Sequence, residues 1–431
     1  MISQAHNGEI QHNDMKPSGY KRQKHSERLY YLDWLRVVAI LGVFYAHNAD
    51  IFDTLYWHVR QQGQQPTDWS VLGTFGGQWG MSLFFILAGA GAWFTLSSRT
   101  SKQFIGDRFK RLLIPFIFAS IFLSPIQAYV MSYYVASGYS LYHGNLLEFF
   151  NYFFQNIHIG WDLSWLAAYG YHLWFLAYLF IISMLALPLL LYLNREQGSQ
   201  FISRLAAFCE RPAGLFVFAL PLALVQIILW APFPSYQGWA DVSIWFFIFV
   251  NGFILLADTR FEATIRKQGK IFLPFCIISV LMIVVSNYAG VLSNLIHAPS
   301  YSISYVLFHL LLSIVSWSFM ISLLYIGIRF LNFRNKAIQY ASEAILPFFI
   351  LHQPVIMTTA FFVLPWNIPS GFKFLIVSTL ALIVTLLLYE LLIRRIKVLR
   401  MLFGLKTSKP HRSVHRQMPP SHSTPALPLH P

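Results

Sequence analysis

The sequence predicts an all-α integral membrane protein: a bundle of about ten transmembrane helices with both termini in the cytoplasm. Of its 431 residues, 56% are apolar, 17% are aromatic and only 11% are charged. The apolar residues come in blocks of about 18 to 25, which is the length that a helix needs to cross the hydrocarbon layer of a membrane. One soluble core cannot bury this much apolar surface, so we expect lipid to cover the excess.

The apolar blocks also divide the chain into a membrane domain and two tails. We expect a transmembrane domain at 28–400, and disordered cytoplasmic tails at 1–27 and 407–431, which are polar and rich in basic residues, Pro, Ser or His. The predicted spans are 32–52, 72–97, 112–135, 172–193, 214–231, 240–257, 272–291, 303–328, 342–364 and 372–393.

The net charge of +14 is compatible with binding either to nucleic acid or to a membrane, and the positions of the basic residues distinguish the two. If the N-terminus is cytoplasmic, 28 of the 31 Lys and Arg residues lie in inner segments. Only Arg60 and Lys373 lie in outer segments, and Arg36 lies within the first span. This is the positive-inside pattern of a multi-pass membrane protein, so a nucleic-acid partner is not needed to explain the charge.

Metal and redox chemistry lack their usual sequence signatures. The two cysteines, Cys209 and Cys276, form no CxxC motif. The histidines of the C-terminal tail have no carboxylate or thiolate neighbours in the sequence. We therefore predict no metal site and no permanently bound cofactor.

The first span carries an unusual pair of ionisable residues, Arg36 and His47. An arginine inside the bilayer costs several kcal/mol and needs a reason. The eleven-residue spacing places both side chains on one helix face, within about 20° and ~16.5 Å apart along the axis. Two interpretations stay open: the pair lines one cavity, where Arg36 holds an anionic or carbonyl group and His47 handles protons, or Arg36 pairs with Asp33 and His47 caps the helix beside Asp50.

These residues introduce a family resemblance that covers about residues 28–393. The Arg and His of the first span, introduced by Tyr-Leu-Asp-Trp-Leu-Arg at 31–36, resemble the opening of the membrane acyltransferases of the acyltransferase type 3 family. The family's order continues in Leu-Phe-Phe-Ile-Leu-Ala-Gly at 83–89, Arg-Phe-Lys-Arg-Leu-Leu-Ile-Pro at 108–115, His-Leu-Trp-Phe-Leu at 172–176 and Leu-His-Gln-Pro-Val at 351–355. The last two motifs are similar to the branch of glucan succinyltransferases and O-acetyltransferases. Ala88 departs from the family pattern, which has Ser at this position and therefore a hydroxyl that this chain lacks.

The resemblance implies an O-acyltransferase of the cell (inner) membrane that acylates extracytoplasmic glycans or related acceptors. Acyl transfer from a thioester to a hydroxyl requires a base, a group that stabilises the oxyanion, and exclusion of water. His47 is the expected general base, Asp50 its orienting carboxylate, and Arg36 a contact for the thioester region of an acyl-CoA co-substrate. Four basic residues of the inner loop 98–111 are expected to bind the phosphates of that donor, although topology alone also explains a basic loop here: Lys102, Arg108, Lys110 and Arg111.

Polar residues of the fourth and ninth spans complete the expected site. His172 and Trp174 begin the fourth span, and His352 and Gln353 lie inside the ninth. Because polar groups within a span are costly, we expect these four to line the substrate cavity, while a simple bond to a neighbouring helix is an equal alternative for His352.

Two functions other than catalysis stay open at this point. A transporter or flippase would favour carboxylates at the middle of the membrane, and here the carboxylates fall near the ends of the spans. A non-catalytic partner in surface-polysaccharide export would have the same fold without chemistry at His47. The sequence leaves open which acyl group moves, with acetyl and succinyl as the leading options, and which acceptor receives it.

Overall fold

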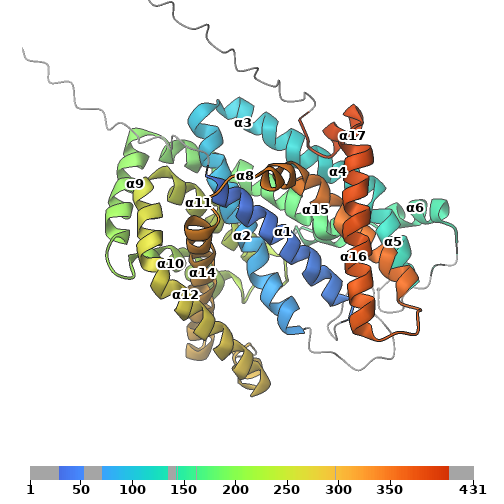
Figure 1. Cartoon of the computed structure of the whole chain (residues 1–431). Helices are drawn as coiled ribbons and strands as arrows, with labels where there is room; N and C mark the ends of the chain where they lie inside the picture. Colours follow the sequence, from blue (N-terminus) through green and yellow to red (C-terminus); the bar gives the residue numbers. More distant parts are fainter. Residues whose placement is uncertain are drawn as a thin grey trace, which may run out of the picture.

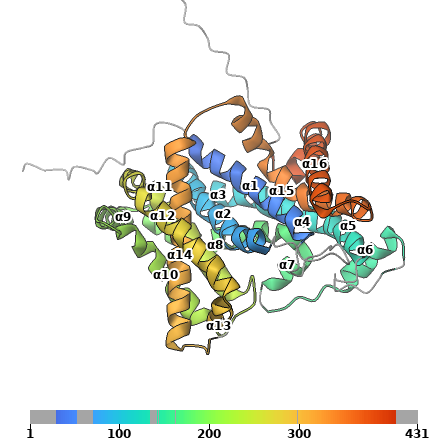
Figure 2. The same ribbon diagram turned by 60° about the horizontal axis from the view of Figure 1, so that its bottom comes forward.

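The computed structural model describes residues 29–52, 70–133, 142, 144–161, 163–296 and 298–406, and these form a bundle of helices (Figures 1 and 2). None of the described residues forms a β-strand. The tails predicted at 1–27 and 407–431 lie outside the described residues. The helices are α1 (Tyr30–Asp50), α2 (Ser70–Ser98), α3 (Ser101–Arg108), the π-helix η1 (Phe109–Leu113), α4 (Ile114–Phe122), α5 (Ser124–Ser132), α6 (Leu146–Gln155), α7 (Ser164–Gly170), η3 (Tyr171–Leu173), α8 (Trp174–Leu193), α9 (Glu196–Cys209), η4 (Gly214–Phe218), α10 (Ala219–Leu229), α11 (Trp239–Ala257), α12 (Thr259–Tyr288), α13 (Val291–Ile296), α14 (Ile303–Phe330), α15 (Lys336–Val363), α16 (Ser370–Leu388), η5 (Tyr389–Ile393) and α17 (Lys397–Leu402).

Eight helical segments of the described residues are long and apolar enough to cross a membrane. They are Gly80–Ser98, Ser101–Ser132, Ser164–Leu193, Trp239–Ala257, Thr259–Ser286, Ile303–Phe330, Lys336–Val363 and Ser370–Ile393. The prediction of an all-helical, multi-pass membrane protein is thereby confirmed. The helices at the other two predicted spans fall outside this set: Gly214–Leu229 is shorter, and α1 carries three charged side chains. The count of ten spans and the cytoplasmic placement of the termini therefore stay predictions.

Helix α1 lies inside the bundle, where it contacts α2, α14, α15 and α16 (Figures 1 and 2). Its apolar residues Leu35, Ile40 and Phe44 are buried at 2%, 3% and 0% exposure. A helix with several polar side chains is stable in this position because Arg36 and His47 face neighbouring helices, while apolar side chains such as Val38 make up the exposed face. The fold therefore accounts for an arginine and a histidine in the first helix.

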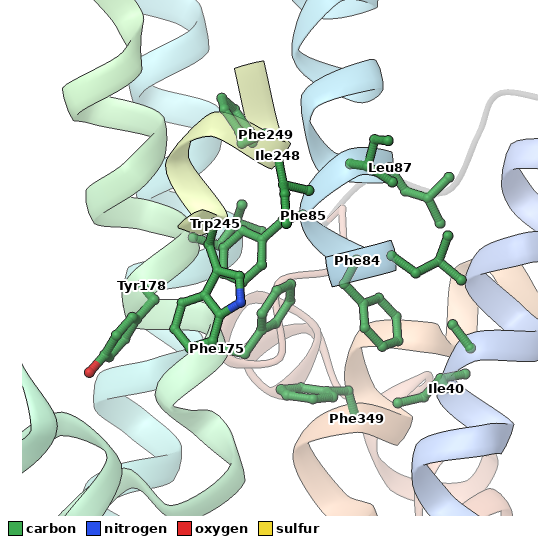
Figure 3. Packing of buried hydrophobic residues seen from close by; sticks show 14 of the residues in the cluster. Ile40, Phe84, Phe85, Leu87, Phe175, Tyr178, Trp245, Ile248, Phe249 and Phe349 are labelled. Atoms are coloured by element: carbon green, nitrogen blue, oxygen red, sulfur yellow. The ribbon is translucent and has the colours of Figure 1, made fainter. Parts of the chain in front are cut away.

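The core beside α1 is built from aromatic rings of four helices (Figure 3). Phe85 of α2 stacks on Trp245 of α11 with ring centroids 5.3 Å apart, and its edge meets Phe175 of α8 at 5.0 Å. Phe175 in turn packs against Phe349 of α15 at 5.8 Å. Offset and edge-to-face rings bury large areas in fixed geometries. This cluster therefore fixes α2, α8, α11 and α15 relative to one another around the site.

Two glycines allow α2 and α11 to approach backbone to backbone. A Cβ atom at Gly89 would lie 1.9 Å from the carbonyl oxygen of Phe249, and one at Gly252 would lie 2.0 Å from that of Ile86. Small residues at such crossings are typical of helix packing in membranes. Gly89 closes the Leu83–Gly89 motif, so this contact gives a physical reason for the glycine in the motif.

Candidate functional site

The C-terminal end of α1 presents an imidazole that is oriented by a carboxylate. His47 and Asp50 are three residues apart and so share a helix face, and His47 Nδ1 lies 3.2 Å from Asp50 Oδ2. Because an ionised carboxylate only accepts hydrogen bonds, Nδ1 carries the proton, and Nε2 is the basic nitrogen. The His47 side chain keeps 24% of its surface exposed, so a substrate can reach it.

His47 packs against a second histidine, His352, which in turn contacts a third, His172. The ring of His352 on α15 stacks on His47 with a centroid distance of 5.5 Å and an interplanar angle of 13°, and the ring of His172 in η3 meets His352 edge-on at 4.9 Å. His352 is fully buried, and its Nδ1 lies 2.7 Å from the carbonyl oxygen of Phe349. This bond places the proton on Nδ1 and leaves Nε2 as a buried acceptor, for which the described residues supply no hydrogen bond.

The rings of the three histidines contact one another in sequence, one pair stacked and the other edge-to-face. No three His, Cys, Asp or Glu side chains in the described part of the chain are placed to hold one metal ion. The structure thus brings together the histidines of three separate sequence motifs, and these come from three different helices.

His172 is held by contacts with the His-Gln-Pro motif of α15 at 352–354, which we call the His172 socket. The amide oxygen of Gln353 accepts a hydrogen bond from the backbone N–H of His172 at 3.3 Å. The ring Nε2 of His172 lies 3.1 Å from the carbonyl oxygen of Ile350 and donates to it. This carbonyl is free because Pro354, four residues later, has no N–H to give it. Each residue of the motif therefore has a local role in holding His172.

Arg36, near the other end of α1, is held by its own helix and by α2. Its NH1 lies 3.3 Å from Asp33 Oδ1, and its NH2 donates to the carbonyl oxygen of Leu87 at 3.1 Å. Gly91 provides space here, since a Cβ atom at this position would lie 3.4 Å from NH2. The predicted pairing of Arg36 with Asp33 is present, and the guanidinium still keeps 32% of its side-chain surface exposed.

Arg108 bonds the α2 carbonyl that follows the one bonded by Arg36. Its NH2 donates to the carbonyl oxygen of Ala88 at 3.4 Å, and its guanidinium lies 4.9 Å from the ring centroid of Phe104. Arg36 is one of its charged neighbours. The remaining basic residues predicted to bind the donor are exposed: Lys102, Lys110 and Arg111. Two guanidinium groups thus bond successive carbonyls of α2, beside a basic exposed surface.

The structure places Arg36 and His47 on one helix, but against different neighbours. Arg36 reaches α2, and His47 reaches α15. A single cavity that serves both groups therefore stays a prediction. Trp174 is 6% exposed and stacks on Trp245 at 4.8 Å, so its side chain belongs to the aromatic core, and a substrate contact through it also stays a prediction.

Sequence reasoning missed the backbone groups of the site. The carbonyls of Phe349 and Ile350 accept from His352 and His172, and those of Leu87 and Ala88 accept from the two arginines. One of these had a signal: a proline inside a span frees the carbonyl four residues earlier, and Pro354 points in this way to Ile350. The others carry no sequence signal, because every residue has a carbonyl.

Comparison with known proteins identifies the family of the chain. The chain is 22% identical to "Glucans biosynthesis protein C" of Salmonella paratyphi B (strain ATCC BAA-1250 / SPB7) and 23% identical to the proteins of that name from Salmonella schwarzengrund (strain CVM19633) and Salmonella agona (strain SL483). Each alignment spans 400 residues, which is 88% of this chain and 95% of the relative. No solved structure matches the chain. The family model of the acyltransferase domain matches residues 29–390, so the chain belongs to the acyltransferase type 3 family of membrane acyltransferases.

Proposed function

We propose that this protein moves an acyl group, acetyl or succinyl-like, from a cytoplasmic acyl-CoA to a hydroxyl of an extracytoplasmic glycan or related acceptor. The observation that carries the proposal is the His47–Asp50 pair, with the partly exposed His47 ring stacked on the buried His352. A carboxylate that orients an imidazole is the arrangement used to activate a hydroxyl for acyl transfer. The name of the relatives, glucans biosynthesis protein C, supports a glucan as the acceptor.

The proposed chemistry begins at His47 Nε2, which accepts the proton of the acceptor hydroxyl while the hydroxyl oxygen attacks the thioester carbonyl. A C–O bond forms, the C–S bond breaks, and the proton passes from His47 to the departing sulfur. Asp50 holds the ring in the required tautomer and stabilises its charged form. General-base catalysis of this kind contributes about 10²–10⁴ in rate.

The donor is proposed to lie along α1. Its phosphates contact Arg108 and the exposed basic residues of the same loop, and Arg36 contacts the pantetheine or thioester region. A guanidinium is a planar, permanently charged group suited to bind a carbonyl or an anion, and the Arg36 side chain is partly exposed beside the Leu87 carbonyl. The donor then extends toward His47, about 16.5 Å along the helix axis.

The decisive experiment compares the masses of surface glycans from cells that lack this protein, cells that carry it, and cells that carry the variant His47→Ala. An increase of about 42 or about 100 mass units per modified site, present only with the intact protein, would identify acetyl or succinyl transfer. The matched control is His158→Ala, because the His158 side chain is exposed, its ring bonds the carbonyl of Asn156 in its own loop, and it lies outside the site. Unchanged masses with the intact protein, or normal acylation with His47→Ala, would overturn the proposal. Transport by reconstituted vesicles without any acyl donor would then favour a flippase.

A further inference from the structure

The chain after the last long helix folds back against the bundle. We call residues 397–406 the C-terminal strap: α17 and the four residues that follow it. The strap ends α17 with Gly404 in the left-handed conformation at a φ of 71°. The Gly404 N–H donates to the Met401 carbonyl at 3.0 Å, and the Leu405 N–H donates to the Arg400 carbonyl at 2.7 Å. These two bonds are a Schellman motif, so the strap has a defined backbone path.

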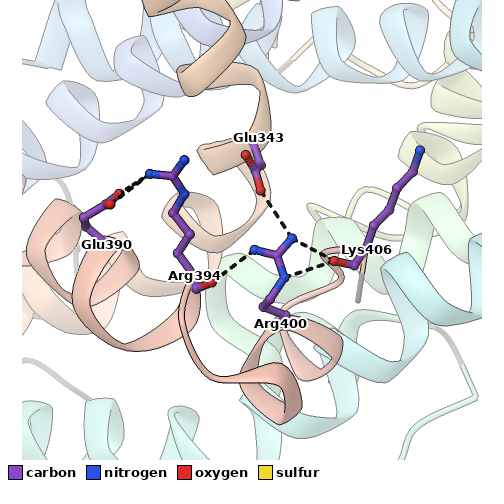
Figure 4. A network of polar contacts seen from close by, with 5 residues as sticks. All are labelled: Glu343, Glu390, Arg394, Arg400 and Lys406. Carbon is purple, nitrogen blue, oxygen red and sulfur yellow. Dashed lines mark hydrogen bonds and ion pairs between the residues drawn. The ribbon is translucent and has the colours of Figure 1, made fainter. Parts of the chain in front are cut away.

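Arg400 fixes the strap to two neighbouring segments (Figure 4). It is 8% exposed, and its Nε and NH2 donate to the carbonyl oxygen of Lys406 at 3.0 and 2.8 Å. Its NH1 donates to the carbonyl oxygen of Arg394 at 3.2 Å, and its NH2 lies 3.4 Å from Glu343 Oε1 at the start of α15. Beside it, Arg394 pairs with Glu390 at 2.8 Å. One buried guanidinium thus ties the end of the strap to α15 and to the end of the helix before it.

The strap packs against the turn that carries the basic residues. Phe403 meets Phe118 of α4 edge-on at a centroid distance of 5.6 Å. A Cβ atom at Gly404 would lie 2.6 Å from Leu346 Cδ2, 3.1 Å from the carbonyl oxygen of Arg111 and 3.2 Å from Pro115 Cγ. The backbone at Gly404 therefore lies directly on the segment 111–115.

This segment is a widened helical turn. Residues 109–113 form the π-helix η1, and Pro115, two residues after its end, has no N–H for the carbonyl of Arg111. Such π-turns are often found at functional sites. Arg108 immediately precedes η1, and Lys110 and Arg111 lie within it. A displacement of this turn would displace all three basic side chains.

We infer that the C-terminal strap positions the basic turn 108–113 for the acyl donor, with Arg400 and Gly404 as positioning residues that do not touch the substrate. The inference rests on the proposed function, because it assigns the basic turn to the donor. It predicts that damage to the strap weakens use of the acyl donor and leaves the chemistry at His47 intact. In the described part of the chain the strap contacts the segment 111–115 and residues 343–346 of α15, and His352 lies further along that helix.

The test compares two glycine substitutions in the purified full-length protein. Gly404→Ala and Gly290→Ala impose the same conformational strain, because both glycines have a φ of 71°, but a Cβ at Gly290 meets nothing within 4 Å. We expect Gly404→Ala to raise the KM for acyl-CoA about tenfold, the equivalent of one hydrogen bond to a charged group, with little change in kcat. Gly290→Ala is expected to retain the KM of the unaltered protein. Equal KM values for Gly404→Ala and the unaltered protein would overturn the inference.

A second variant covers the case in which Gly404→Ala does not fold. Arg400→Lys keeps the charge but removes the planar guanidinium whose N–H groups bond the carbonyls of Lys406 and Arg394. The same rise in the KM for acyl-CoA is expected. A normal KM for a folded Arg400→Lys protein would overturn the inference.

Direct binding of a non-hydrolysable acyl-CoA analogue separates this inference from the proposed function. If the unaltered protein does not bind the analogue, the proposed function fails, and the inference fails with it. If Arg108→Ala weakens binding and the two strap variants do not, only the role of the strap is wrong. Weaker binding in all three variants would support both.

Discussion

The two ends of α1 hold their functional groups by different means. At the C-terminal end, His47 is held by side chains: the carboxylate of Asp50 and the ring of His352. At the other end, Arg36 bonds one side chain of its own helix and, on α2, the carbonyl of Leu87. Ring and carboxylate partners depend on residue type, whereas a carbonyl is supplied by any residue. The histidine end should therefore be sensitive to the identity of its neighbours, and the arginine end to their backbone position.

The largest effect is expected at the histidine end. His47→Ala removes the proposed base, and we expect the rate of acyl transfer from acyl-CoA by the purified protein to fall about 10²–10⁴-fold. The KM for acyl-CoA should change little, because the donor phosphates are assigned to the other end. A loss of donor binding with unchanged kcat would remove the distinction between the two ends.

The arginine end is tested by a substitution that keeps the charge. Arg36→Lys removes the planar guanidinium that bonds both Asp33 and the Leu87 carbonyl. Each hydrogen bond to a charged group contributes about 1.5–3 kcal/mol to stability or binding. We expect the KM for acyl-CoA to rise about tenfold. Steady-state kinetics with varied donor concentration measure this. A fall in kcat alone would instead assign Arg36 to the chemical step.

A substitution in the His172 socket should separate stability from activity. Pro354→Ala supplies an N–H to the Ile350 carbonyl, which then no longer needs His172 as its donor. Because an interior proline costs a helix about 3 kcal/mol, we expect a higher Tm in detergent. We also expect acyl transfer to fall about threefold, as His172 loses one neutral hydrogen bond. A lower Tm would mean that the proline stabilises the fold in another way.

The smallest effect is expected at Ala88, where the family resemblance led us to expect Ser. The structure uses the carbonyl of this residue, which accepts from Arg108, and Ala88→Ser keeps that carbonyl. The new hydroxyl is expected to bond back to its own helix, so activity should stay within about twofold of that of the unaltered protein. A large gain in activity would show that the hydroxyl itself contacts substrate in other family members.

The all-helical membrane fold could be predicted from the sequence, because apolar length decides it locally. Helix periodicity also indicated that Arg36 and His47 share a face and that Asp50 lies beside His47. The meeting of His47, His172 and His352 could not be predicted from spacing, because it depends on how three distant helices pack. The close contact of Gly89 with Phe249 was hidden for the same reason.

The bond between His172 and the Ile350 carbonyl also limits how the molecule can move. If the start of α8 separated from α15, a backbone acceptor without a helical partner would be stranded in a non-aqueous interior, which costs several kcal/mol. These two elements should consequently travel as one rigid body during turnover. Any opening that admits a bulky acceptor must come from other parts of the bundle, and distance measurements between paired spin labels on α8 and α15 should stay constant while labels elsewhere shift.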